Sequence, residues 1–221
     1  IRKRSLVSEA MKCIICHQTR WNILWSVCDR MYHRQGTFSL YRCTACGFIR
    51  LHPKPSQHQL RTYYPSNYYS YESNTDVGIF WRLRTYLILH SIRQNILSYT
   101  LSVLFPVPAM PRYVKAGNIL DVGCGVGDTL QLFQQIGWRP YGIDIDQNAI
   151  TIANQRGLND VTYGTYKDIE KYPDDYFDAI RLYHVIEHLD NAPACLAVIY
   201  KKLKQNGQLI IGTPNANSLI A

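Results

Sequence analysis

The sequence predicts an α/β protein with a doubly wound, mostly parallel sheet and a small cysteine-rich unit before it. Three observations support this fold class. From residue 118 onward, strand and helix patterns alternate regularly, which is typical of parallel strands joined by crossover helices. A turn with three glycines at alternate positions follows the first of these strands, and two C-x-x-C pairs lie near the N-terminus. We therefore expect a cysteine-rich unit at residues 11–50, a connector rich in Tyr, Arg and Pro at 51–117, and the α/β domain at 118–221.

Apolar runs, turn residues and helix-ending glycines place the elements of this sheet. The predicted strands are residues 118–122, 140–145, 161–163, 177–183 and 208–212. The predicted helices are residues 128–135, 148–155 and about 193–203. Gly137 and Gly157 are expected to end the first two helices, and the Asn206-Gly207 turn is expected to lead into the fifth strand.

Charge is distributed unevenly along the chain. Residues 1–117 carry 16 Lys and Arg against 4 Asp and Glu, whereas residues 118–221 carry 8 against 12. A basic first half favours anionic partners such as nucleic acid, phosphorylated sugars or nucleotide-linked substrates, and a solubilising surface is the alternative. No apolar run reaches about 18 residues, so no membrane span is expected. Because no signal peptide is evident and the seven cysteines include metal-like pairs, a cytoplasmic location is expected.

The most informative segment is residues 119–130, which read ILDVGCGVGDTL. Its glycines, Gly123, Gly125 and Gly127, are spaced G-x-G-x-G, which lets a backbone approach a cofactor before a helix begins. A dinucleotide fingerprint requires G-x-G-x-x-G, but here an acidic residue stands where the third glycine would fall. Asp144 lies roughly 20 residues beyond the turn, where a carboxylate can accept both ribose hydroxyls of a nucleoside cofactor.

The segment from Asp121 to Gly127 resembles motif I of class I S-adenosylmethionine (SAM) methyltransferases. Three later blocks, FDAI at 177–180, HVIEHL at 184–189 and LKQNGQLIIGTPN at 203–215, are similar to FD-x-I, H-V-x-E-H-L and L-K-x-x-G-x-L-x-I-x-T-P-N, in the same order. Together these blocks resemble a subgroup that includes ubiquinone-biosynthesis O-methyltransferases and many enzymes of polysaccharide and sugar-modifying clusters. The resemblance covers residues 118–217 and implies a Rossmann-like methyltransferase sheet with SAM as cofactor.

The resemblance also implies which residues contact the cofactor. Asp121 and the three glycines are expected around the methionine moiety of SAM, Asp144 at the ribose, and Ile145 against the adenine. An acidic residue of the family commonly accepts from the adenine amino group, and Asp168 is the nearest candidate here. The predicted cofactor residues are therefore Asp121, Gly123, Gly125, Gly127, Asp144, Ile145 and Asp168.

The same resemblance implies seven strands, whereas five are predicted here. We therefore expect the sheet to be truncated after the fifth strand, with a C-terminal part of the domain missing. A shorter sheet that is complete as it stands is the alternative. Near the other end, Met11 is a plausible natural start, so residues 1–10 are expected to be extra.

Cys13, Cys16, Cys43 and Cys46 form two C-x-x-C pairs that can supply four thiolates to one tetrahedral zinc ion. Four unrelated cysteines are the alternative. A structural zinc is expected, because a segment of about 40 residues cannot bury enough core alone. The resemblance agrees, since a zinc-binding unit followed by P-x-P-S and a tyrosine-rich stretch precedes many sugar-type methyltransferases.

The connector contains two further features. The tyrosines within residues 63–69 are expected either to line a substrate entrance or to pack between the zinc unit and the sheet. Residues 79–105 are expected to form one or two amphipathic helices, with peripheral membrane attachment as a minority alternative.

His184, Glu187 and His188 follow the fourth predicted strand, at the active-site edge of a doubly wound sheet. If the chain turns helical from Tyr183, these three side chains share one face. They are then candidates for a general base or for a divalent metal site, and capping and bracing of the loop is the alternative. In related methyltransferases the first of these positions is often Glu.

The sequence leads to three functional hypotheses. The first is methyl transfer from SAM to a small-molecule acceptor, namely a sugar, a sugar nucleotide or a related metabolite. The second is an RNA methyltransferase that uses the basic zinc unit to hold the phosphate backbone. The third is a catalytically silent SAM-binding protein.

Overall fold

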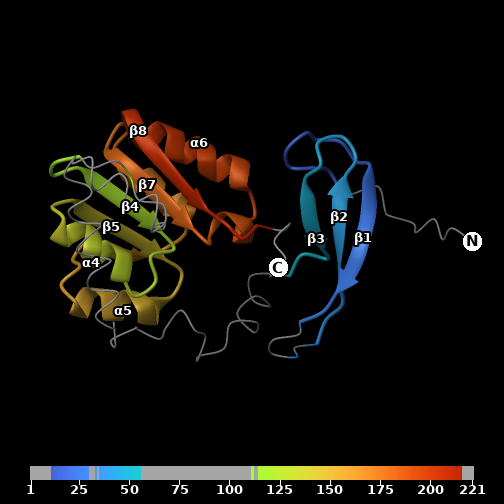
Figure 1. The fold of residues 1–221 in the computed structure, drawn as a ribbon, viewed down its shortest axis with the longest axis horizontal. Helices are drawn as coiled ribbons and strands as arrows, with labels where there is room; N and C mark the ends of the chain where they lie inside the picture. The colour runs from blue at the N-terminus through green and yellow to red at the C-terminus, as the bar shows by residue number, and fades with distance from the viewer. Residues whose placement is uncertain (1–10, 30–32, 34, 56–110, 112–113, 216–221) are drawn as a thin grey trace, which may run out of the picture. The chain divides into compact units, whose positions relative to one another are not determined.

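The computed structural model describes residues 11–29, 33, 35–55, 111 and 114–215 (Figure 1). The chain divides into two compact units, one within residues 1–68 and the other within residues 69–221. The tyrosines of 63–69 and the helices expected in 79–105 lie outside the described residues. No helix in the described ranges is long and apolar enough to cross a membrane.

The first unit is a three-stranded antiparallel sheet in the order β1-β2-β3. Its strands are β1 (Trp21–Val27), β2 (Phe38–Cys43) and β3 (Ile49–His52). Aromatic and β-branched residues, which suit a pleated surface, dominate β1. One C-x-x-C turn precedes β1 and the other joins β2 to β3, so the antiparallel pairing brings sequence-distant cysteines to the same end of the sheet.

The second unit contains the predicted parallel sheet, with five strands in the order β6-β5-β4-β7-β8. The strands are β4 (Asn118–Val122), β5 (Arg139–Asp144), β6 (Val161–Tyr163), β7 (Phe177–Tyr183) and β8 (Leu203–Gly212). The doubly wound parallel fold class predicted from the sequence is therefore confirmed. Because the chain leaves β4 toward β5 on one side and returns as β7 on the other, the carboxyl end of β4 is the switch point at which such sheets bind ligands.

The helices of this unit begin where the sequence predicts, within one residue. They are α4 (Asp128–Gln135), α5 (Gln147–Gln155) and α6 (Ala192–Lys202), with 3-10 turns η2 (Tyr166–Lys171) and η3 (Ile186–His188). Asp146 caps α5 by accepting from Asn148 N at 2.8 Å, and Asn191 caps α6 by accepting from Ala194 N at 3.1 Å. Side-chain acceptors at these positions satisfy N–H groups that a helix leaves unpaired.

Two hydrophobic cores cover the opposite faces of the parallel sheet. Ile119 and Leu120, adjacent in β4, belong to different cores because successive strand residues point to opposite faces. The helices α4 and α5 pack on the first core, and α6 and η2 on the second. Burial of strand residues on both faces explains why the β4 and β7 sequences read as nearly continuous apolar runs.

The fifth strand differs from its prediction. The structure starts β8 at Leu203, not at Gln208, because Leu203 already pairs with Phe177 before the ladder resumes at Ala179 and Gln208. Residues 204–207 therefore form a bulge opposite Asp178, and Asn206 adopts a left-handed φ of 65° within it. The predicted Asn206-Gly207 turn is thus an excursion inside a longer strand.

Candidate active site and metal centre

The glycine turn connects the carboxyl end of β4 to the start of α4. Gly123, Gly125 and Gly127 all adopt positive φ values, of 75°, 53° and 83°. Gly123 N donates to Ile143 O at 2.7 Å, which fastens the turn to β5. A Cβ on Gly123 would overlap Cγ2 of Val185, so the loop after β7 packs directly on the turn. The turn and the segment that contains His184 therefore lie together at the carboxyl edge of the sheet.

Asp144 ends β5 beside the glycine turn. Its carboxylate accepts a hydrogen bond from Gly125 N at 2.7 Å and another from Asp146 N at 2.9 Å, one on each oxygen. Burial raises the pKa of this carboxyl group, although the backbone N–H donors oppose the change. Each carboxylate oxygen retains acceptor capacity, so the group can still receive the two hydroxyls of a ribose.

Asp121 lies in β4 directly below the turn and is 1% exposed. Both of its oxygens accept from Arg181 Nη1 of β7, at 3.0 and 2.8 Å. Burial raises the pKa of Asp121 to about 6, while the Arg181 charge and hydrogen bonds lower it and Asp144 raises it further. The charge of Asp121 is therefore balanced within the protein by the charge of Arg181.

The remaining two predicted cofactor residues occupy different surroundings. Ile145 follows Asp144 and is 70% exposed, which leaves a large apolar side chain available to a flat ring. Asp168 lies in η2 and accepts from Thr165 N at 2.7 Å and from Thr165 Oγ1 at 3.3 Å. Its carboxylate thus completes a capping box, which is a structural task in addition to the predicted adenine contact.

The segment after β7 carries the predicted catalytic residues. A helix beginning at Tyr183 does not form: His184 adopts a left-handed φ of 56°, and only the 3-10 turn at Ile186–His188 follows. The structure nevertheless brings His184 Nδ1 to 3.5 Å from Glu187 Oε1, with the His184 side chain half-exposed. His188 N donates to Val185 O at 2.9 Å within the same turn. A non-glycine residue held at positive φ is often found at functional sites.

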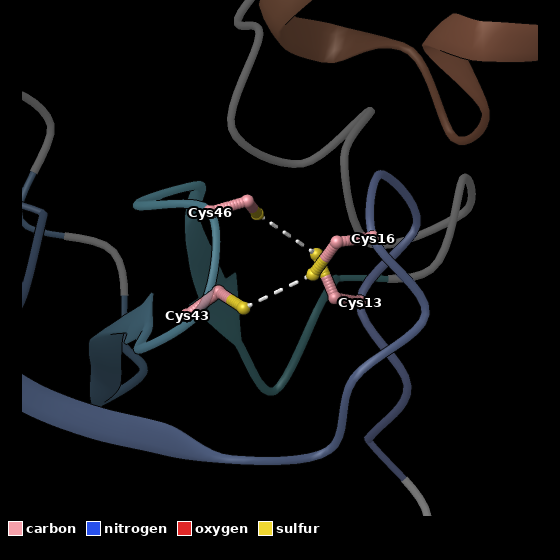
Figure 2. Close-up of side chains that lie close together, drawn as sticks. All are labelled: Cys13, Cys16, Cys43 and Cys46. Atoms are coloured by element: carbon pink, nitrogen blue, oxygen red, sulfur yellow. Dashed lines mark hydrogen bonds between the residues drawn. The ribbon is translucent and has the colours of Figure 1, made fainter.

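The four cysteines predicted to bind zinc converge in the first unit, as Figure 2 shows. Their Sγ atoms all lie within 4.8 Å of one another, with Cys13 and Cys46 at 3.6 Å and Cys16 and Cys43 at 3.5 Å. Within the described part of the chain this is the only group of three or more residues able to hold a metal. Four sulfurs bound to one zinc at about 2.3 Å stand about 3.8 Å apart, so the cluster fits that ion.

The two cysteine turns have the same backbone geometry. His17 N donates to Cys13 O and Gly47 N to Cys43 O, each at 3.0 Å. Both His17 and Gly47 are left-handed, with φ values of 62° and 78°. His17 therefore occupies in the first turn the place that Gly47 occupies in the second. Its left-handed backbone and its N–H close the first cysteine turn.

Electrostatics of the sulfur cluster favour a cation. Although a backbone N–H of Gln18 opposes the change, burial and the sulfurs of the other three cysteines raise the pKa of Cys16 to about 12. A backbone N–H of Cys46 lowers the pKa of Cys43 to about 7, against the effect of burial. The thiolates cannot all form at such short separations without a positive charge between them, which a zinc ion supplies.

Two residues that belong to this site were not among the predicted ones. Arg181 pairs with Asp121, and its guanidinium carbon lies 4.5 Å from the centroid of the Tyr183 ring. The Tyr183 ring in turn packs edge-on against His184, with centroids 4.5 Å apart. The available signal was a lone arginine within the mostly apolar strand FDAIRLY. The parallel pairing of β4 and β7 aligns this arginine with Asp121.

The same part of the chain matches a known protein family. Residues 90–221 match the family model described as "Methyltransferase domain". Phosphoethanolamine N-methyltransferase 1 of Arabidopsis thaliana is 32% identical over 107 residues, which cover 44% of this chain and 21% of that protein. The ubiquinone biosynthesis O-methyltransferase of Bradyrhizobium sp. (strain ORS 278) is 28% identical over 103 residues, which cover 45% and 41%.

A Haemophilus influenzae protein of unassigned function is 24% identical over 149 residues, covering 62% of this chain and 58% of that protein. The chain thus spans between 21% and 58% of the length of these three relatives. A solved SAM-dependent methyltransferase from Archaeoglobus fulgidus shares 26% identity at a TM-score of 0.44, over 61% of this chain and 60% of that one. Because the family model matches more than half of its residues, the chain belongs to the family of SAM-dependent methyltransferase domains.

Proposed function

We propose that the protein transfers a methyl group from SAM to a small-molecule acceptor, namely a sugar, a sugar nucleotide or a related metabolite. One observation carries the proposal: the loop with His184 packs on the glycine turn through Val185 and Gly123, with the Asp144 carboxylate on the other side of that turn. A cofactor held by the turn and by Asp144 would therefore present its reactive end near His184. The predicted cofactor residues, from Asp121 to Asp168, are part of this proposal.

The residues of the loop support acid–base assistance. Bound SAM supplies an electrophilic methyl group, and the protein has to align the acceptor and remove its proton. Glu187 Oε1 faces His184 Nδ1, so a proton on Nδ1 leaves Nε2 as the proton acceptor. We assign His184 as the general base and Glu187 as the group that orients it, with His188 at the end of the same turn.

The cofactor part of the proposal is tested by measuring SAM binding calorimetrically to the full chain. Asp144→Asn should weaken SAM binding by about 10-fold or more, since a hydrogen bond to a charged group contributes about 1.5–3 kcal/mol. Asp174→Asn, which changes an exposed carboxylate paired with Lys202, is the matched control and should leave the affinity unchanged. Equal SAM affinity in wild type and Asp144→Asn would refute the ribose assignment.

The proposed acceptor class rests on the resemblance to sugar-type enzymes and on the excess of Lys and Arg in residues 1–117, which favours anionic partners. A panel of sugars, sugar nucleotides and phosphorylated amines, incubated with SAM labelled in its methyl group, tests it directly. Transfer of label that is lost in His184→Gln supports both the activity and the base. SAM binding without transfer to any member of the panel would favour a silent SAM-binding protein.

The first unit supports a structural zinc site at Cys13, Cys16, Cys43 and Cys46. With residues 11–50 as its extent, the domain boundaries at 51–117 and 118–221 are part of the proposal. The seven cysteines of the whole chain form no disulfide, which suits the reducing cytoplasm, the location that we propose. Zinc analysis of the purified chain should give one ion per molecule, and none would refute the site.

An RNA acceptor is a second candidate, favoured by one observation in the first unit. The Arg50 guanidinium lies over the Trp21 ring, 5.9 Å from its centroid, on a sheet that also carries Arg42. Stacked aromatic and cationic groups suit single-stranded RNA. Binding of single-stranded RNA that weakens steeply with salt, and weakens further in Arg50→Gln, would support this candidate; binding by neither protein would exclude it.

A further inference from the structure

Arg181 is a buried cation between the buried apolar residues Ile180 and Leu182. It lies in β7, is 6% exposed, and pairs with Asp121 of the neighbouring strand β4. Among the described residues, its Nε has no hydrogen-bond partner although it is buried. Since such an unpaired donor costs about 1–3 kcal/mol, and buried ion pairs are often replaceable by apolar pairs without loss, stability alone is a weak reason for this arrangement.

The guanidinium contacts two parts of the site at once. On one side, Nη1 donates to both oxygens of Asp121, directly below the glycine turn. On the other side, the guanidinium lies against the ring of Tyr183, at 4.5 Å from its centroid. A cation at this distance from an aromatic face is attracted to it, more strongly where water is excluded.

The Tyr183 ring is held on its other contacts as well. The ring packs against Gly212 of β8 so closely that a Cβ on this glycine would overlap it. His184 N donates to Gly212 O at 2.8 Å, which anchors the next residue to the same glycine. The rings of Tyr183 and His184 meet edge-on, with an interplanar angle of 85°. The position of the His184 imidazole therefore depends on the position of the Tyr183 ring.

We propose that Arg181 is a positioning residue. Its pair with Asp121 holds the guanidinium below the glycine turn, and its contact with Tyr183 fixes the His184 imidazole relative to that turn. The role of His184 in this inference rests on the proposed function. The contacts form a continuous series from Asp121 through Arg181, Tyr183 and His184 to Glu187. Displacement of Arg181 thus moves the imidazole of His184 through the Tyr183 ring.

The resonances of the His184 imidazole report this position directly, without any ligand. They are recorded by NMR on the full chain with labelled histidine and assigned by their loss in His184→Gln. Tyr183→Leu removes the neighbouring ring and defines the full change in the resonances. We expect Arg181→Met to move them in the same direction by at least half of that change.

Two further variants make the result decisive. Arg181→Met leaves the Asp121 carboxylate buried without a partner, whereas Asp121→Asn combined with Arg181→Met removes both charges and should fold. This double variant should move the His184 resonances as far as Arg181→Met does. Lys202→Met breaks the pair between the buried Lys202 and the exposed Asp174, whose atoms lie 2.6 Å apart, and should leave the His184 resonances in place. Wild-type His184 resonances in the double variant, or an equal movement in Lys202→Met, would overturn the proposal.

The proposed function fails on a different measurement. If the wild-type chain does not bind SAM in calorimetry, the methyltransferase activity is refuted. The contribution of Arg181 to catalysis through His184 is then refuted as well. The resonances would still tell whether Arg181 positions His184, because they are recorded without SAM.

Discussion

Replacing Gly123 by alanine tests whether the glycine turn and the loop after β7 are packed as one body. Gly123 has a φ of 75° and its missing Cβ leaves the space that Val185 Cγ2 occupies. Gly125 in the same turn has a φ of 53° and nothing within 4 Å of the position of its Cβ. The two alanine variants therefore share the backbone strain and differ in the steric overlap.

The expected sizes follow from these two contributions. A left-handed backbone conformation at alanine lowers the free energy of unfolding by about 1–2 kcal/mol in both variants. Forcing an extra carbon into packed surroundings lowers it by about 1–3 kcal/mol more, in Gly123→Ala alone. The gain from restricting the unfolded chain is the same in both, so it cancels in the comparison. Gly125→Ala should thus lose about 1–2 kcal/mol of unfolding free energy, and Gly123→Ala roughly 2–5 kcal/mol.

Urea unfolding followed by far-ultraviolet circular dichroism measures both losses. Val185→Ala supplies the decisive comparison, because it empties the space that the new Cβ requires. The double variant Gly123→Ala with Val185→Ala should therefore be more stable than the sum of the single losses predicts, with a coupling of about 1–3 kcal/mol. Equal losses for the two glycine variants, together with a coupling of zero, would refute the packing of this loop on the turn.

Three further predictions concern single side chains. Cys43→Ser should remove bound zinc and unfold the first unit, whereas serine at the exposed Cys28 should do neither; atomic absorption and circular dichroism measure the two effects. Burial raises the pKa of Asp121 to about 6, so the stability from its protonated form is present below about pH 4 and is lost as pH rises through 6. Arg181→Met should raise that pKa further and cost about 3–5 kcal/mol at pH 7.5, with a deficit that narrows by pH 5.5 in urea titrations; a deficit independent of pH would contradict this. Burial raises the pKa of Cys195 to about 11, so iodoacetamide at pH 8 should alkylate it far more slowly than Cys28, which mass spectrometry of the native chain reveals.

The sequence was sufficient for the parallel sheet because its signals are local. The apolar runs of β4 and β7 and the glycines after α4 and α5 mark element ends, and the structure places those ends within one residue of the prediction. The cysteine turns were equally legible, since a C-x-x-C pair followed by a residue that accepts positive φ presents two sulfurs on one side.

Features that depend on pairing between distant segments could not be predicted from local sequence. The bulge of β8 arises because the ladder with β7 forms in two parts, and nothing local marks Leu203 as a strand residue. His184 does not begin a helix because its φ of 56° is left-handed, and its N–H pairs with Gly212 O of the neighbouring strand β8. The partner of Asp121 required knowledge that β4 and β7 are neighbours in register, which follows from topology and not from spacing.

The three glycines of the turn, alike in sequence, have different physical reasons to be glycine. Gly123 leaves room for Val185 of the loop that carries His184, and a Cβ on Gly127 would overlap Leu158, a buried residue of the first core. Gly125 has open space beyond it, and its N–H holds the Asp144 carboxylate. Among the three, only Gly125 has open space at the position of its Cβ, whereas Gly123 and Gly127 lie against Val185 and Leu158. The pattern G-x-G-x-G thus combines one open position with two close contacts inside the protein, and under the proposed function substitutions at Gly123 and Gly125 should separate stability from SAM affinity.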